Sequence, residues 1–310
     1  MSKFMGLLVR EWREHANGFL WAPGAILCVL LLAGLFSLFV DPVVKPDIDD
    51  LDRERLEQRL DDSADLDELS GLELLATMTL DVAGSTDAEL REKMTRALSM
   101  VAVPFNLVFF ILAFSVLINS LYDERKDQSI LFWKSMPVRD VDTVMSKWVF
   151  VSWIAPITTI VAICLAQLLA VAFISVFVEQ GMAGRIWSAS QIWLRPFDIV
   201  VRFIFLSLWL LPIAGWVMFV SAWAKRLPTL IALGAPWILS LLERLFVGSN
   251  YVSQLIRNHL AQMYNTSLSS VVDLTAPLAS LGQLSFWLGL VLGVALLAAA
   301  VLCRARINEG

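Results

Sequence analysis

Five long apolar runs that contain no charged residue are the feature that most constrains how this chain folds. They cover residues 19–40, 97–122, 148–178, 203–224 and 274–303. Each run is long enough to cross about 30 Å of hydrocarbon, which takes about 20 helical residues. Inside a bilayer the backbone polar groups must find partners within the protein, which favours helices. The sequence therefore predicts an all-α integral membrane protein.

Composition agrees with a membrane location. The mean hydropathy is +0.70, and 58% of the residues are apolar against 17% charged, whereas soluble domains are about 45–50% apolar. The net charge of −5, with no basic cluster, gives no sign of a nucleic-acid surface. Cys28, Cys164 and Cys303 lie in apolar runs without CxxC spacing, so we predict neither disulfides nor a metal site.

A sixth apolar run, residues 227–242, is interrupted by Glu243 and Arg244. The positive-inside rule favours its crossing, because Arg304 and Arg306 would otherwise lie outside the cell. With six crossings, both termini are cytoplasmic. The predicted spans are 18–40, 100–121, 148–178, 199–224, 227–247 and 281–303, followed by a cytoplasmic tail at 304–310.

The N-terminal segment 1–17 is predicted to form an amphipathic helix on the membrane surface. Phe4, Leu8 and Trp12 repeat every four residues beside a charged face, as in helices that lie in the headgroup plane. A solvated cytoplasmic end is the alternative interpretation.

Three segments are predicted to lie outside the cytoplasm. Residues 41–99 carry 17 acidic residues against seven basic ones, with leucines spaced for short helices. We interpret them as a small, acidic, helical insertion that acts as a solvated lid; recruitment of a cationic substrate is the alternative. Residues 179–198 and 248–280 are outer loops, and the second has apolar spacing that allows it to re-enter the outer leaflet.

Four polar residues within the predicted spans are candidates for lining a transport pathway: Asn106, Asn119, Gln167 and Glu243. Such side chains are costly where they face lipid, so they are expected to face other helices or a cavity. Contacts between helices are the alternative for the three amides. For Glu243, beside Arg244, the alternative is extension of both side chains to the membrane interface.

Other residues predict local structure. Asp198 and Arg202 are four apart and can pair on one helix face. Gly289 and Gly293 form a GxxxG face suited to close helix packing. Prolines without a backbone donor predict helix kinks at Pro104, Pro156, Pro212 and Pro236.

The cytoplasmic stretch 122–147 combines balanced charge with four consecutive apolar residues, Ile130 to Trp133. A contiguous apolar patch of this kind usually marks a contact surface, so a soluble partner is expected to cover it; the lipid surface is the alternative. The chain has no GxxxxGK[ST] loop, no GxSxG elbow and no HExxH helix. It is therefore not expected to be an ATPase or another enzyme by itself.

This stretch resembles the ABC-2 family of exporter permeases, through Glu124-Arg125, Pro137-Val138 and Lys147 at the start of the third span. Gln128-Ser129 stands where the family often has Gly-Thr. The N-terminal helix, the six-span layout and the long last outer loop are also similar. The resemblance implies a permease subunit in the cell inner membrane, paired with a second copy as a homodimer. It implies no cofactor on this chain, with ATP and Mg bound by a separate ATPase subunit.

The resemblance also implies a coupling helix that sits in a groove of the ATPase. The ATPase-coupling residues so implied are Glu124, Arg125, Lys126, Ile130, Leu131, Phe132, Trp133 and Lys134. The apolar ones would be buried in the groove and the charged ones would make contacts at its rim. Few charges in the spans favour a hydrophobic or amphiphilic cargo, and the resemblance implies that this cargo is moved outward by alternating access. The alternative is a non-transporting membrane scaffold or sensor whose outer insertion binds a ligand.

Overall fold

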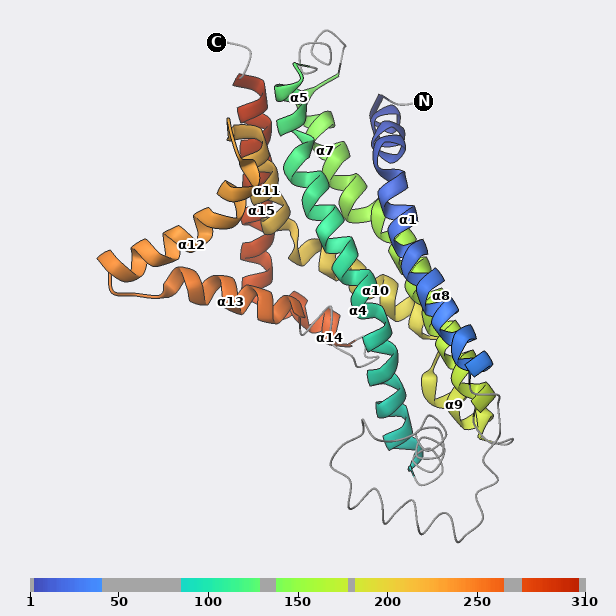
Figure 1. Cartoon of the computed structure of the whole chain (residues 1–310). Helices are drawn as coiled ribbons and strands as arrows, with labels where there is room; N and C mark the ends of the chain where they lie inside the picture. The colour runs from blue at the N-terminus through green and yellow to red at the C-terminus, as the bar shows by residue number, and fades with distance from the viewer. Residues whose placement is uncertain (1–2, 41–84, 129–137, 178–181, 265–274, 307–310) are drawn as a thin grey trace. The chain divides into compact units, whose positions relative to one another are not determined.

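A computed structural model of the whole chain describes residues 3–40, 85–128, 138–177, 182–264 and 275–306. Within these ranges the regular structure is helical and no strand is present (Figure 1). Five described helices are long and apolar enough to cross a membrane, or up to six if a pair bent by 50° counts as one span. The predicted all-α membrane class is therefore confirmed at this level.

The helices follow one another in a simple order along the chain. They are α1 (Lys3–Val40), α4 (Asp87–Ser120), α5 (Tyr122–Lys126), α7 (Asp140–Val149), the π-helix η2 (Phe150–Ile154), α8 (Ala155–Phe177), α9 (Ala183–Ser190), α10 (Arg195–Trp209), α11 (Leu211–Trp223), α12 (Pro228–Phe246), α13 (Tyr251–Met263), α14 (Thr275–Ala279), the short 3-10 helix η4 (Ser280–Gly282) and α15 (Leu284–Arg306).

Several boundaries differ from the predicted ones. The segment 1–17 is not a separate helix, because α1 runs without a break through the surface segment and the first span. The second span begins earlier, at Asp87, where Thr86 and Glu89 form a capping box. In that box the Thr86 amide donates to Glu89 Oε2 (2.9 Å) and the Glu89 amide to Thr86 Oγ1 (3.3 Å). The rest of the predicted insertion, residues 41–84, lies outside the described residues.

Two predicted proline sites coincide with breaks in helical geometry. Pro156 has no N–H to donate to the carbonyl of Ser152, and the π-helix η2 lies directly before this position. Pro212 opens α11 after Leu210, where α10 and α11 are bent by 50°. Pro104 and Pro236 lie inside α4 and α12.

The chain divides into two compact units. The smaller one comprises Gly24–Pro104 and Ala162–Pro196. Its core packs Leu90, Met94 and Leu98 of α4 with residues of α8 and α9, namely Val171, Ile186 and Ala189. Gln167 of α8 is buried, and its Nε2 donates to the Leu98 carbonyl at 3.0 Å, which joins α8 to α4.

The larger unit comprises Met1–Pro23, Phe105–Val161 and Phe197–Gly310. Its closest helix packing joins α11 to α15 through glycines. A Cβ on Gly293 would lie 2.6 Å from Leu211 Cγ, and one on Gly215 would lie 2.7 Å from the Gly293 carbonyl oxygen. The predicted close-packing role of the GxxxG face is confirmed at Gly293, while Gly289 faces the His259 ring. The predicted Asp198–Arg202 pair is also present, at 2.8 Å.

Candidate functional site

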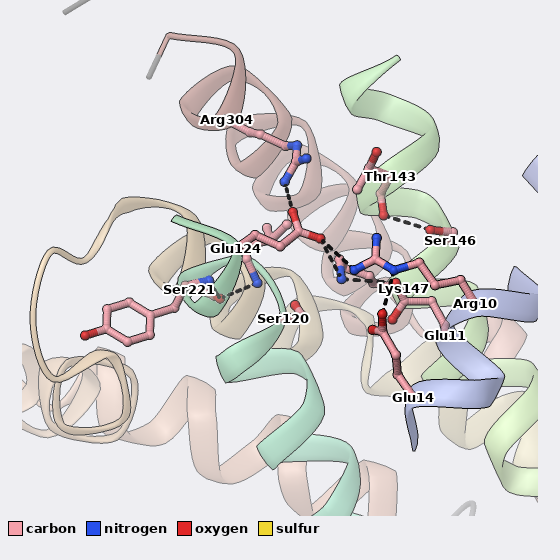
Figure 2. Close-up of polar contacts among 12 residues, drawn as sticks. Arg10, Glu11, Glu14, Ser120, Glu124, Thr143, Ser146, Lys147, Ser221 and Arg304 are labelled. Atoms are coloured by element: carbon pink, nitrogen blue, oxygen red, sulfur yellow. Dashed lines mark hydrogen bonds and ion pairs between the residues drawn. The ribbon is translucent and has the colours of Figure 1, made fainter. Parts of the chain in front are cut away.

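A group of charged side chains, four of them buried and two half-buried, joins four helices of the larger unit (Figure 2). We call it the ion cluster and define it by Arg10 and Glu11 of α1, Glu124 of α5, Asp140 and Lys147 of α7, and Arg304 of α15. These six residues are three acids and three bases, and Arg10 also pairs with a fourth acid, Glu14, at 2.6 Å. Charges are costly to bury unless they are paired and hydrogen-bonded, which makes this group the most constrained polar feature of the described chain.

Glu124 lies at the centre of the ion cluster, as Figure 2 shows. Its side chain is only 5% exposed. Oε1 lies 3.1 Å from Lys147 Nζ and 3.8 Å from Arg10 Nη2. Oε2 accepts a hydrogen bond from Nη1 of Arg304. One carboxylate thus contacts cations from three other helices.

The two central cations each contact a second acid. Lys147 Nζ donates to Glu11 Oε1 at 3.1 Å, and Arg304 Nε donates to Asp140 Oδ1 at 2.9 Å. Glu11, Lys147 and Arg304 are almost completely buried. The result is a continuous chain of ion pairs from α1 through α7 and α5 to α15.

Arg125, next to Glu124, joins α5 to the end of α11. Its Nη2 donates to the carbonyls of Ser221 (2.5 Å) and Ala224 (2.8 Å), which lie at the C-terminus of α11, where a cation is favourable. In return, the Ser221 hydroxyl oxygen accepts from the amides of Leu121 (3.2 Å) and Tyr122 (3.1 Å). The start of α5 and the end of α11 therefore cap each other.

These contacts hold both flanks of the segment between α5 and α7. Glu124 and Arg125 lie just before it, and Asp140 and Lys147 lie in the helix that follows it. The two flanks of this segment are therefore joined to α1, α11 and α15 through polar contacts.

The predicted coupling residues fall into two groups. Of those described, Glu124 is buried and Arg125 half-buried, and both contact their own chain, which differs from the predicted rim position; Lys126 is exposed. The remaining ones lie outside the described residues: Ile130, Leu131, Phe132, Trp133 and Lys134. The sequence did not indicate the partners of Glu124, because Lys147 was named only for the resemblance to the family and Arg304 only for the positive-inside rule. The sequence signal that could have indicated the pairing is that Lys147 and Arg304 each lie at one end of a predicted span, near which acidic residues also occur.

The four candidate pathway residues occupy separate environments, and no hydrogen bond joins any two of them within the described ranges. Asn106 has a buried Oδ1 with no hydrogen-bond partner among the described residues. Asn119 is half-buried. Gln167 makes the interhelical hydrogen bond to α4 noted above, which favours a role in contacts between helices over a role in lining a pathway.

Glu243 has a specific local role that the sequence did not indicate. Its Oε1 accepts from Ser249 Oγ (2.6 Å) and from the Tyr251 amide (2.7 Å), and its Oε2 accepts from the Val252 amide (2.8 Å). These amides belong to the first turn of α13, whose N-terminus favours a negative charge. Glu243 therefore caps α13 and fixes the turn from α12.

One further group could in principle hold a metal ion. Ligand atoms of Glu11, Glu14 and His15 lie within 4.8 Å of one another. Both carboxylates are already bound by cations, since Glu11 pairs with Lys147 and Glu14 with Arg10 at 2.6 Å. We therefore assign these residues to ion pairing.

The chain was compared with family models, with curated proteins and with solved structures, and no match was found in any of the three.

Proposed function

We propose that this chain is the membrane-spanning permease subunit of an ATP-driven exporter of the ABC-2 type. It moves a hydrophobic or amphiphilic cargo outward by alternating access, while a separate ATPase subunit binds ATP and Mg. The observation that supports this most is the ion cluster, which links both flanks of the α5–α7 connection to α1 and α15. Glu124 and Lys147, two of the residues that carry the resemblance to the family, contact each other in it.

The proposed mechanism is a transfer of motion. Closure of the ATPase on ATP displaces the connection between α5 and α7, where the apolar residues Ile130 to Trp133 occur in the sequence. Buried ion pairs resist separation, because pulling one partner away leaves an uncompensated charge in a dry site. The displacement is therefore passed to α1, α7, α11 and α15 as a concerted tilt.

The positions of the helix ends are compatible with an even number of crossings. The first part of α1 and the last turn of α15 both contribute to the ion cluster, through Arg10 and Arg304. At about 1.5 Å per residue, the N-terminus of α15 lies about 30 Å along its axis from Arg304. The six-span topology, with both termini cytoplasmic in the inner membrane, agrees with this and with the positive-inside distribution. A second copy completes the proposed permease.

The test is reconstitution with the ATPase. The tagged chain is purified from the membranes of its own host, a co-purifying ATPase is recognised by its GxxxxGK[ST] motif, and the pair is placed in vesicles. ATP hydrolysis is expected to rise when the chain is present. Trp133→Ala is expected to abolish that rise, whereas Trp193→Ala, at a residue 83% exposed in the α9–α10 connection, leaves it unchanged.

Two results would contradict the proposal. One is an ATPase rate that does not respond to the chain. The other is a chain that purifies without any such ATPase but binds a ligand through its outer insertion, which would favour the scaffold or sensor instead.

A further inference from the structure

An apolar cavity of about 220 Å³ lies within the larger unit, between α4, the η2–α8 segment, α10 and α11. Four phenylalanine rings line it: Phe109, Phe110 and Phe114 of α4 and Phe203 of α10. Neither the ion cluster nor the candidate pathway residues contribute to the lining. The cavity is therefore distinct from the site described above.

The chemistry of the walls limits what can occupy the cavity. No ionisable side chain lines it, and the polar side chains in its wall are Ser152 and Ser207. The Ser207 hydroxyl already donates to the Ile204 carbonyl at 2.8 Å. A water molecule needs two to four polar partners, which this wall does not offer, and an enclosed apolar cavity of about 150 Å³ in a protein binds benzene; the cavity here is larger and only partly enclosed. This larger cavity has room for a substituted ring or a fused pair of rings.

The aromatic walls favour an aromatic guest over an alkyl chain. Phe109 makes edge-to-face contacts with Phe110 and with Phe203, both with ring centroids 5.8 Å apart. Aromatic pairs in this geometry gain interaction beyond the burial of their area. A ring placed against these side chains extends the same packing, whereas an acyl chain gains only from area.

The cavity also touches both breaks in helical geometry. Ser152 belongs to the π-helix η2, and Pro156, just after it, also lines the cavity. On the other side, Leu210 lies at the 50° bend between α10 and α11. π-helical segments are rare and frequently mark functional positions. A molecule that fills the cavity therefore contacts residues of both breaks.

We infer that this cavity binds one uncharged aromatic molecule, with at most one hydrogen-bonding group facing Ser152 or Ser207. The site lies within a single copy of the chain and needs no ATPase. The inference is therefore independent of the proposed exporter function, and it can be tested with the purified full chain alone.

The experiment is photolabelling in phosphatidylcholine nanodiscs with a small uncharged aryl diazirine, followed by peptide mapping. Label is expected on cavity-lining residues of α4 and α10, to saturate with probe concentration, and to fall at least fivefold with excess naphthalene. Ala113→Leu, which fills the cavity from α4, should reduce labelling at least fivefold. Ile111→Phe, on the same helix at a residue 59% exposed, should leave it unchanged.

Two further arms keep the inference open to refutation. If Ala113→Leu does not fold, Ala214→Val narrows the cavity from α11 with one methyl fewer added and is expected to reduce labelling at least twofold. A phosphatidylcholine carrying the diazirine in its acyl chain is run in parallel. Equal labelling of the cavity by that lipid without competition from naphthalene, or unsaturable labelling spread over the exposed faces, would overturn the inference.

Discussion

Replacing Glu124 by glutamine should destabilise the fold strongly, because it removes the central charge of the ion cluster. The change keeps the shape of the side chain, but it removes the carboxylate that contacts Lys147, Arg304 and Arg10, in a group whose central residues are buried. Lys147 and Arg304 each lose one carboxylate partner and keep another, Glu11 and Asp140 respectively. The effect therefore reports on how much the cluster contributes to holding four helices together.

The magnitude follows from the burial. Breaking a buried ion pair by removing one partner costs about 3–5 kcal/mol. Because both cations keep a second acid at 3.1 Å and 2.9 Å, we expect the lower end, about 3 kcal/mol, or about 10²-fold in the unfolding equilibrium. Glu92→Gln is the matched control: Glu92 pairs with Arg96 at 2.8 Å with both side chains mostly exposed, which is worth about 0.3–0.5 kcal/mol.

The assay is denaturant unfolding of the purified chain in micelles, followed by tryptophan fluorescence. A double variant, Glu124→Gln with Arg304→Gln, removes both partners of one ion pair and should cost less than the sum of the two single changes. Equal destabilisation by Glu124→Gln and Glu92→Gln, or strict additivity in the double variant, would refute the view that the cluster acts as one buried network.

Three further predictions concern other contacts. Gly293→Ala should lower the free energy of unfolding by about 1–3 kcal/mol in the same assay, because the new Cβ would lie 2.7 Å from the backbone carbon of Leu211 in α11. Gly234→Ala is the control and should not lower it, because nothing lies within 4 Å of a Cβ at that position. Glu243→Gln should speed hydrogen exchange of the first amides of α13 at least threefold, measured by mass spectrometry, and unchanged exchange would contradict the capping role. Arg125→Glu should abolish ATPase stimulation in the reconstituted pair, because it places a carboxylate against the carbonyls at the end of α11. Lys126→Glu, at the exposed neighbouring residue, should reduce the stimulation less than twofold. Equal effects of the two changes would argue against a role for the α5–α11 contact.

Some of the candidate site was within reach of sequence reasoning. Glu124, Arg125 and Lys147 were singled out because they carry the resemblance to the ABC-2 family, and all three make buried or half-buried polar contacts. Their partners were not predicted. Glu124 and Arg304 are 180 residues apart, and Lys147 and Glu11 are 136 apart, so no local spacing relates them.

Local patterns succeeded where they did not have to specify a distant partner. The Asp198–Arg202 pair lies on one turn of helix. At Gly293 the missing side chain predicted close packing, but not that Leu211 of α11 is the facing residue. Glu243 shows the limit, since its carboxylate caps a helix that begins eight residues later. That contact depends on how the chain turns after α12, which the spacing of apolar residues does not specify.

The sequence by itself determined the helical class and the positions of the long apolar runs, because hydropathy and helical period are properties of consecutive residues. Only the tertiary structure decided which charges meet, where the helices depart from ideal geometry, and that an aromatic-lined cavity lies between the two breaks. The physical reason is that burial and pairing depend on the register between helices. That register is set by packing among segments far apart in the chain, so the pattern of neighbouring residues does not specify it.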